Sequence, residues 1–223
     1  MSRQIKALIF DFDGLIIDTE IPDYASWQAV YAQYGQALPV AMWGQIVGGT
    51  GASDFDPHRY LEELSGQSLD REEVWINRRT AYLDSVAEQP ILPGVKDYLD
   101  GAKDRGLKLA VASSSPDNWV SGHLTRLCLI DYFDAIKTAD DVARTKPDPE
   151  LYLAALAALD VAAAEAVVFE DSGNGVRAAK AAGIYTVAVP NGLTAQLTIE
   201  GADLRLNSLA ELSLDELLAQ IPD

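Results

Sequence analysis

The sequence is poor in cysteine and in basic residues. A single cysteine, Cys128, occurs in 223 residues, which excludes an internal disulfide framework and favours a reducing compartment, so we expect a cytoplasmic protein. Lysine and arginine total 17 against 34 aspartates and glutamates, and the formal net charge is −17. Because nucleic acids and anionic membranes are bound through basic patches, we expect neither as a partner.

Long apolar runs are also missing. No stretch reaches the roughly 20 residues that span a bilayer, and the N-terminus lacks the basic and then apolar segments of a secretion signal. The hydrophobic share of 48% is that of an ordinary globular protein. The length suffices for one sizeable domain with an insertion, or for two small domains.

Strand-like and helix-like segments alternate over most of the chain. An apolar run at 5–10 predicts a first strand, and further strands are predicted at 107–112, 135–138, 166–169 and 184–189. Helices are predicted at 95–105, 116–129, 150–159 and 174–182. This alternation predicts an α/β fold, with a doubly wound parallel-sheet (Rossmann-like) core.

The segment from residue 18 to residue 89 interrupts the alternation. It contains helical patterns at 24–34, 57–64 and 71–86 and no convincing strand. We therefore expect an inserted α-helical cap domain at 18–89, between two parts of the core at 1–17 and 90–223. Two connections to the core would let the cap hinge. Within it, Trp43 and Trp75 are expected in the cap interior and His58 on its surface, while Cys128 is expected to pack in the core.

The first predicted strand ends abruptly in two acids. Asp11 and Asp13 follow the apolar run, and Gly14 next to them allows a sharp turn. Ligands of open parallel sheets bind at the carboxyl ends of the strands. Two acids there would repel each other unless a cation or a reaction required them. One carboxylate as Mg²⁺ ligand and nucleophile, with its neighbour as acid and base, is the natural pairing.

Polar groups close the later strands as well. Ser113 and Ser114 follow the second strand, Lys146 lies in a loop with Pro147 and Pro149, and Glu170 and Asp171 end the fourth predicted strand. Each group alone is common in loops and helix caps. Together, if the strands are parallel, they lie on one edge of the sheet and supply an anion cradle, a cation and a second acid pair.

This set of motifs resembles the haloacid dehalogenase superfamily, in its β-phosphoglucomutase-like and phosphatase branch. The elements Asp-x-Asp, strand-Ser, Lys-Pro-Asp-Pro and Glu-Asp-Ser stand in the family's order, and the inserted helices resemble its small α-helical cap. The resemblance implies that Asp11 attacks phosphorus to form an aspartyl phosphate. It implies that Asp13 protonates the leaving alcohol and then activates water.

The resemblance also implies the binding groups. Ser113, Ser114, Lys146 and Gly14 would hold the phosphoryl group. Mg²⁺ would be bound by the side chains of Asp11 and Asp171 and by the backbone carbonyl of Asp13. Glu170 would either bind the metal directly or contact the residues that bind it. The family's dehalogenases lack a carboxylate at the position of Asp13, so its presence favours phosphate ester chemistry.

The cap departs from the pattern of the true mutases. Their cap histidine corresponds here to Asp23, and the lysine and arginine that hold a second phosphate correspond to Val47 and Gly51. The sequence therefore predicts a Mg²⁺-dependent phosphatase of a small phosphorylated metabolite, such as a sugar or polyol phosphate. Alternatives are a β-phosphoglucomutase-like mutase, with Arg59, Arg78 or Arg79 on the second phosphate, and a non-catalytic binding protein for such metabolites. The sequence gives neither the substrate nor the oligomeric state.

Overall fold

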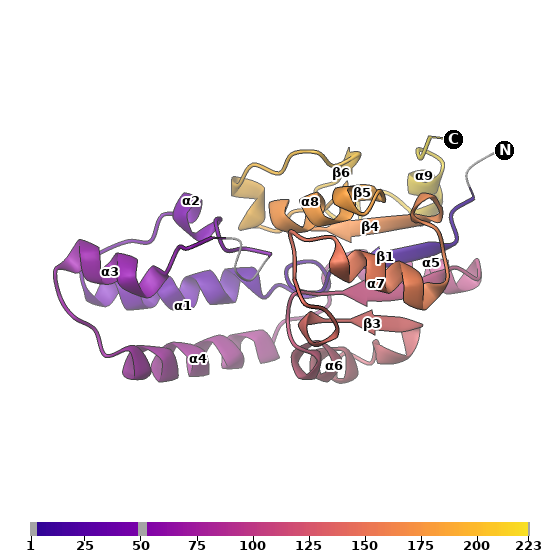
Figure 1. Cartoon of the computed structure of the whole chain (residues 1–223). Helices are drawn as coiled ribbons and strands as arrows, with labels where there is room; N and C mark the ends of the chain where they lie inside the picture. Colours follow the sequence, from indigo (N-terminus) through magenta and orange to yellow (C-terminus); the bar gives the residue numbers. More distant parts are fainter. Residues whose placement is uncertain (1–3, 49–52, 223) are drawn as a thin grey trace.

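The computed structural model describes residues 4–48 and 53–222. A six-stranded sheet forms the part of the molecule in which both chain ends lie (Figure 1). Its strand order is β3-β2-β1-β4-β5-β6, and every neighbouring pair is parallel. The strands are β1 (Ala7–Phe10), β2 (Lys108–Ala112), β3 (Ala135–Lys137), β4 (Ala166–Glu170), β5 (Tyr185–Ala188) and β6 (Leu204–Arg205).

Helices cover both faces of the sheet, so the strands are buried on two sides, as parallel sheets require. In β1, Leu8 and Phe10 pack into one apolar cluster, and Ala7 and Ile9 pack into another on the opposite face. The first cluster is completed by α5 (Val95–Asp104), α6 (Asp117–Arg126) and α9 (Leu214–Leu218). The second is completed by α7 (Glu150–Leu159) and α8 (Gly173–Ala181). Short 3₁₀ turns occupy Ile130–Tyr132, Ala139–Asp141, Ala163–Glu165 and Thr194–Gln196.

A helical segment extends to one side of the sheet (Figure 1). It contains α1 (Glu20–Gln33), α2 (Val40–Trp43), α3 (Pro57–Ser65) and α4 (Arg71–Ala87). No strand occurs in its described residues, and most of its buried apolar side chains pack into a cluster around Trp27, Tyr31 and Leu61, to which Leu193 also belongs. We call residues 18–89 the cap; that they form a separate domain stays a prediction.

Local signals explain where the cap helices begin. The carboxylate of Asp56 accepts hydrogen bonds from the first free N–H groups of α3, those of His58 and Arg59, and Pro57 occupies the first helical position. Asp70 caps α4 in the same way. The sequence therefore predicts the starts of both helices correctly.

All five predicted strands and all four predicted helices outside the cap are present, with ends shifted by up to three residues. The sequence does not predict α2, β6 or α9. These elements have only two to five residues each, too few to produce a periodic pattern.

Three expectations about single side chains are wrong. Cys128 is exposed, because α6 ends at Arg126 and the chain turns with a φ of 57° at the cysteine. Trp75 is 58% exposed, since the first two turns of α4 lie largely in solvent. His58 is only 6% exposed and packs edge-on against Trp27. Trp43, in contrast, is buried as expected.

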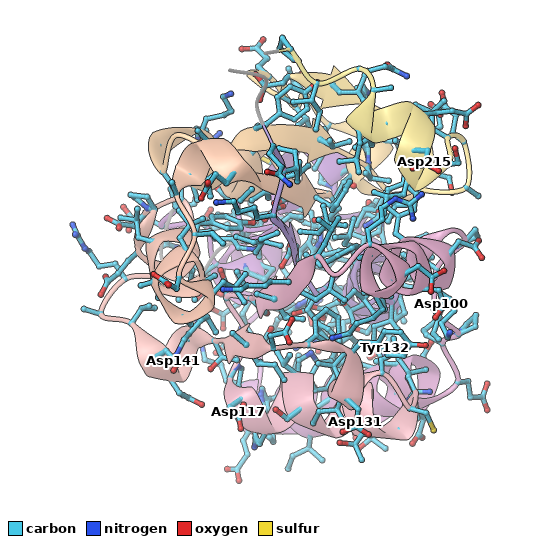
Figure 2. All side chains as sticks on the ribbon, turned by 90° about the vertical axis from the view of Figure 1, so that its right-hand side faces the viewer. Asp100, Asp117, Asp131, Tyr132, Asp141 and Asp215 are labelled. Carbon is cyan, nitrogen blue, oxygen red and sulfur yellow. The ribbon has the colours of Figure 1, made fainter. Side chains whose placement is uncertain are left out.

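The acidic residues lie mainly on the outside of the sheet and its helices. Figure 2 views the molecule from the side opposite the cap and shows Asp100, Asp117, Asp131 and Asp215 around its periphery, all of them exposed. The strongly negative charge is thus largely solvated. Among residues 4–48 and 53–222, no helix is long and apolar enough to cross a membrane.

Candidate active site at the carboxyl edge of the sheet

Three neighbouring strands end in the polar residues singled out from the sequence. Asp11 follows β1, Ser113 follows β2, and Asp171 follows β4, and β2 and β4 are the two neighbours of β1. The order of the sheet reverses at β1, which is where doubly wound proteins bind ligands. The parallel topology thus brings together side chains more than 100 residues apart in sequence.

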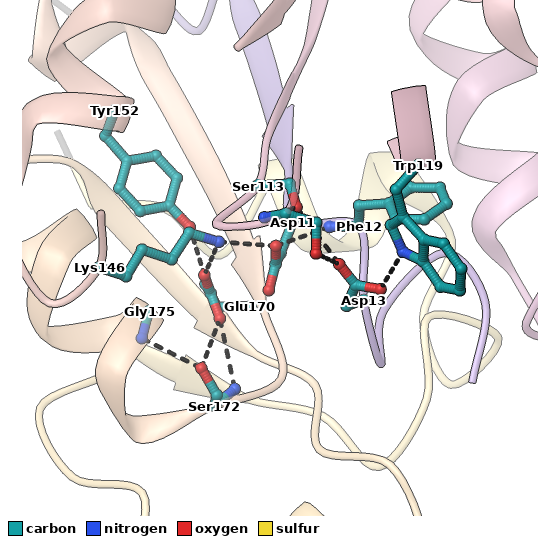
Figure 3. A network of polar contacts seen from close by, with 11 residues as sticks. Asp11, Phe12, Asp13, Ser113, Trp119, Lys146, Tyr152, Glu170, Ser172 and Gly175 are labelled. Carbon is teal, nitrogen blue, oxygen red and sulfur yellow. Dashed lines mark hydrogen bonds and ion pairs between the residues drawn. The ribbon is translucent and has the colours of Figure 1, made fainter. Parts of the chain in front are cut away.

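A buried lysine connects two of these strand ends (Figure 3). Lys146 Nζ lies 2.6 Å from Asp11 Oδ1 and 2.7 Å from Glu170 Oε1, and the lysine is only 1% exposed. The Asp11 oxygen also accepts a 2.7 Å hydrogen bond from the Phe12 backbone N–H. Asp11 is therefore held with one oxygen fixed by its own loop and by the ammonium.

Glu170 is fully occupied by its protein partners. Its Oε1 accepts hydrogen bonds from Lys146 and from the Tyr152 hydroxyl, and its Oε2 accepts them from the N–H and hydroxyl groups of Ser172. A Cβ atom on Gly175 would lie 1.8 Å from the carboxylate, so the first turn of α8 leaves space for Glu170 only because a glycine stands there.

The buried charges perturb one another strongly. Burial, and next the charge of Glu170, raise the pKa of Asp11 well above its usual range, while Lys146 partly lowers it. Burial, followed by the charge of Asp11, raises the pKa of Asp171. Burial alone would lower the pKa of Lys146, but Asp11 and Glu170 outweigh it and raise that pKa. Two carboxylates thus pair with one ammonium and a third, that of Asp171, lies beside them, so the site has an excess of negative charge.

This excess fits a divalent cation. Asp11, Glu170 and Asp171 each offer a carboxylate oxygen, and these oxygens lie within 4.8 Å of one another. Asp171 Oδ2 accepts a hydrogen bond from Asn191, whereas Asp171 Oδ1 is buried and has no hydrogen-bond partner in the described part of the chain. Oxygen donors of this kind suit Mg²⁺, and a bound cation would stabilise the ionised carboxylates.

Asp13 lies beside this cluster and is held from the other side. Ser115 Oγ donates to its Oδ2 at 2.6 Å and Ser113 Oγ at 3.3 Å, while Trp119 Nε1 donates to its Oδ1 at 2.9 Å. The sequence analysis missed Trp119. The only available signal was its place in the first turn of the helix after the serine loop, where an aromatic residue usually packs in the core.

An acidic cavity of about 200 Å³ opens in front of Asp11 and Asp13. The cap contributes Glu20 and Asp23 to its lining, and burial raises the pKa of both carboxyls. No lysine or arginine is among the described residues that line it. Larger cavities of about 240 and 400 Å³ lie elsewhere, but they lack this set of groups.

The remaining predicted residues surround the cavity unequally. Ser114 lines it, and its buried hydroxyl has no partner among residues 4–48 and 53–222. Lys146 lies behind Asp11 and does not line the cavity. Gly14 faces away from it: its N–H donates to Ile17, and a Cβ there would lie 2.2 Å from Asp171 Oδ2. Gly14 therefore lets the turn pack against Asp171.

The loop after α2, here called the cap loop, contacts the sheet part of the molecule beside the site through Val47 and Gly48. The Val47 carbonyl accepts a 2.7 Å hydrogen bond from Asn174 Nδ2 at the start of α8. Gly48, with a φ of +74°, approaches Ser172 so closely that a Cβ would lie 2.0 Å from its hydroxyl. Gly51, the other cap-loop position singled out from the sequence, lies outside the described residues.

The chain is similar to known proteins along nearly its whole length. A family model described as haloacid dehalogenase-like hydrolase matches residues 8–189. The provisionally named phosphatase YhcW of Bacillus subtilis is 49% identical over 214 residues, 96% of each chain. The phosphorylated carbohydrates phosphatase of Thermotoga maritima is 34% identical over 185 residues, 82% of this chain and 84% of that one. A crystal structure of a provisionally named β-phosphoglucomutase from Thermotoga maritima has a TM-score of 0.75 and 31% identity, covering 97% of this chain and all of the other.

Replacing the buried lysine should destabilise the protein strongly. Lys146→Met leaves Asp11 and Glu170 buried without their cation, and we expect the free energy of unfolding to fall by about 3–5 kcal/mol in urea titrations. The loss should grow as the pH rises, because unfolded carboxylates ionise freely while the buried ones have raised pKa values.

The matched control is Lys137→Met, which breaks the more exposed pair with Asp141. It should cost less than about 1 kcal/mol. Equal losses for the two variants would contradict the structural role of Lys146.

Proposed function

The chain belongs to the haloacid dehalogenase-like hydrolase family, and we propose that it is a Mg²⁺-dependent phosphatase of small phosphorylated carbohydrates. It is an enzyme of the phosphoric monoester hydrolase class. One observation carries the proposal: Asp11 and Asp13 face the same cavity, the first held by a buried lysine and the second by hydroxyl and indole donors. Two carboxylates in such different surroundings suit two different roles.

In the proposed reaction Asp11 is the nucleophile. One of its oxygens attacks phosphorus, the bond between phosphorus and the ester oxygen breaks, and the proton of Asp13 passes to the departing oxygen. The products of this half-reaction are an alcohol, an aspartyl phosphate and the carboxylate of Asp13. Water then attacks phosphorus, gives its proton to Asp13, and releases inorganic phosphate with Asp11 restored.

Ser113, Ser114 and Lys146 would hold the phosphoryl oxygens. The unpartnered hydroxyl of Ser114 in the cavity supports this assignment. Lys146 would act from behind Asp11, where it neutralises charge and fixes the attacking carboxylate. Phosphoryl transfer depends mainly on positioning and on charge neutralisation, and these groups provide both.

Asp11, Asp171 and the backbone carbonyl of Asp13 would hold Mg²⁺, which supplies further neutralisation of phosphate charge when bound. The unpartnered oxygen of Asp171 supports its role as a ligand. Both oxygens of Glu170 already accept hydrogen bonds, which favours a role in holding Lys146 over direct binding of the metal.

The lining of the cavity supports a leaving group that is rich in hydroxyls and carries no second phosphate. Glu20 and Asp23 can accept hydrogen bonds from hydroxyl groups, but they repel another anion. The name of the Thermotoga maritima relative, a phosphorylated carbohydrates phosphatase, agrees with this substrate class.

The mutase remains the alternative, because several similar proteins carry that name. A mutase needs cations for a second phosphate, and the three arginines considered for that role already have partners. Arg78 pairs with Asp23, Arg79 lies over the rings of Tyr82 and Trp119, and Arg59 donates to a backbone carbonyl. The retained acid at Asp13 also argues against a protein that only binds its ligand.

Replacing the nucleophile should abolish turnover while the fold persists. Asp11→Asn keeps the shape but removes the attacking charge, so kcat should fall by ~10³-fold or more, about 4 kcal/mol of barrier. Release of inorganic phosphate from sugar and polyol monophosphates measures this, with Asp131→Asn, an exposed acid, as the control. A variant that keeps a tenth of the activity would remove Asp11 from this role.

Removing the metal should stop the reaction reversibly. We expect a chelator to abolish activity, Mg²⁺ to restore it, and Ca²⁺ to inhibit, because its larger and looser coordination shell displaces the attacking carboxylate. Mg²⁺ should also raise the unfolding temperature of the wild type but not of Asp171→Asn, since binding stabilises only a chain with an intact site. Full activity in excess chelator would contradict the metal-dependent mechanism.

A second phosphate should not improve binding. Each missing charge-assisted contact is worth roughly 1.5–3 kcal/mol, about one to two decades in affinity. A sugar bisphosphate should therefore bind no better than its monophosphate, and phosphate release should need no bisphosphate primer. Rapid, primer-dependent interconversion of glucose 1- and 6-phosphates, with little phosphate released, would instead establish the mutase.

A further inference from the structure

The carboxylate of Asp13 is held on both oxygens by one neighbouring segment. Ser113 and Ser115 donate to Oδ2, and the indole N–H of Trp119 donates to Oδ1 (Figure 3). All three donors lie between the end of β2 and the first turn of α6. This short segment therefore sets the direction in which the carboxyl group points.

The donors differ in what they allow. A serine hydroxyl can donate or accept and can rotate, whereas an indole N–H only donates. When Asp13 carries a proton, that proton cannot lie between Oδ1 and the N–H of Trp119. The N–H therefore favours Oδ1 as the acceptor oxygen and Oδ2 as the hydroxyl oxygen. Oδ2 is the oxygen that Ser113 and Ser115 contact at the end of β2, where the phosphoryl group is expected. Trp119 thus holds Oδ1 as a hydrogen-bond acceptor and fixes the orientation of the Asp13 carboxyl group.

The indole ring is itself fixed on its faces and edge. Tyr82 stacks on it, with the ring centroids 5.7 Å apart and an interplanar angle of 16°. His123 packs against it edge-to-face, with the centroids 4.3 Å apart and an angle of 74°. The guanidinium of Arg79 lies 5.5 Å from the ring centroid. Tyr82 and Arg79 belong to α4. The cap therefore packs against the indole ring that donates a hydrogen bond to Asp13.

We propose that Trp119 is a positioning residue, which holds the carboxyl group of Asp13 in one orientation through Oδ1 while α4 is packed against the indole ring. The inference rests on the proposed function, in which the proton of Asp13 passes to the ester oxygen as its bond to phosphorus breaks. Trp119 acts through Asp13 alone. The effect of Trp119 on the reaction rate should therefore be largest for the leaving groups that most need a proton.

The test compares two esters in Trp119→Phe, which keeps an aromatic ring for Tyr82 but loses the N–H donor. The leaving group of an alkyl phosphate such as sorbitol 6-phosphate is a strongly basic alkoxide, which needs the proton. The leaving group of p-nitrophenyl phosphate is p-nitrophenolate, which is a stable anion. We expect kcat/KM for the alkyl ester to fall by ~10-fold or more, part of the 10²–10⁴ of general acid catalysis. The aryl ester should lose less than about threefold, because its leaving group needs little protonation.

Two further variants serve as controls. Trp75→Phe, at an exposed indole of the same helix as Tyr82, should leave both esters unchanged. Tyr82→Leu removes the stacked ring but not the N–H, and we expect it to lower kcat/KM for the alkyl ester more than for the aryl ester. If Tyr82→Leu affects neither ester, the dependence on α4 is wrong.

Equal losses on both esters in Trp119→Phe, or a raised KM with kcat unchanged, would mean that the indole only packs, and would overturn the inference. So would unchanged kinetics on both esters. The proposed function survives these outcomes as long as the wild type releases phosphate and Asp11→Asn does not. A wild type that hydrolyses neither ester overturns both.

Discussion

The burial of Lys146 between Asp11 and Glu170 is the interaction on which the rest of the site depends. Ions lose much hydration free energy when they are buried, so such a triad persists only with close contacts and additional hydrogen bonds. Here the Phe12 N–H, the Tyr152 hydroxyl and Ser172 provide them. The triad joins the ends of β1 and β4 to the loop before α7, and so gives the Asp11 carboxylate one orientation.

The same triad leaves an excess of negative charge that the protein alone does not neutralise. Asp171 adds a third carboxylate, and burial raises the pKa values of Asp11 and Asp171. A bound divalent cation would reverse this local field. The overall charge of −17 has little influence by comparison. Exposed acids such as Asp100 and Asp215 are solvated, and salt screens their charges (Figure 2). An anionic substrate is therefore compatible with a strongly acidic protein.

The sheet domain and the cap contribute different things. The ends of β1 and β2 supply Asp11, Asp13 and the serine hydroxyls, and the cap supplies the acids Glu20 and Asp23 to the same cavity. Contacts between the two parts beside the cavity include those of Val47 with Asn174 and of Tyr82 with Trp119. The second contact lies one hydrogen bond away from Asp13, so the position of the cap and the orientation of that carboxyl are physically linked.

The sequence by itself determined five of the six strands that the structure describes, the parallel sheet and the polar residues at its edge. The central strands β1, β2 and β4 are short apolar runs with polar stops, and parallel topology then places the stops together without further information. Only the tertiary structure decided that both oxygens of Glu170 are occupied, that Gly14 packs on Asp171, and that Trp119 reaches Asp13. In sequence Trp119 is an aromatic residue in a helix, Tyr82 is another in a distant helix, and their contact depends on how the cap packs against the sheet domain. Local patterns encode which face of an element is apolar, but they do not encode which distant side chain lies against it.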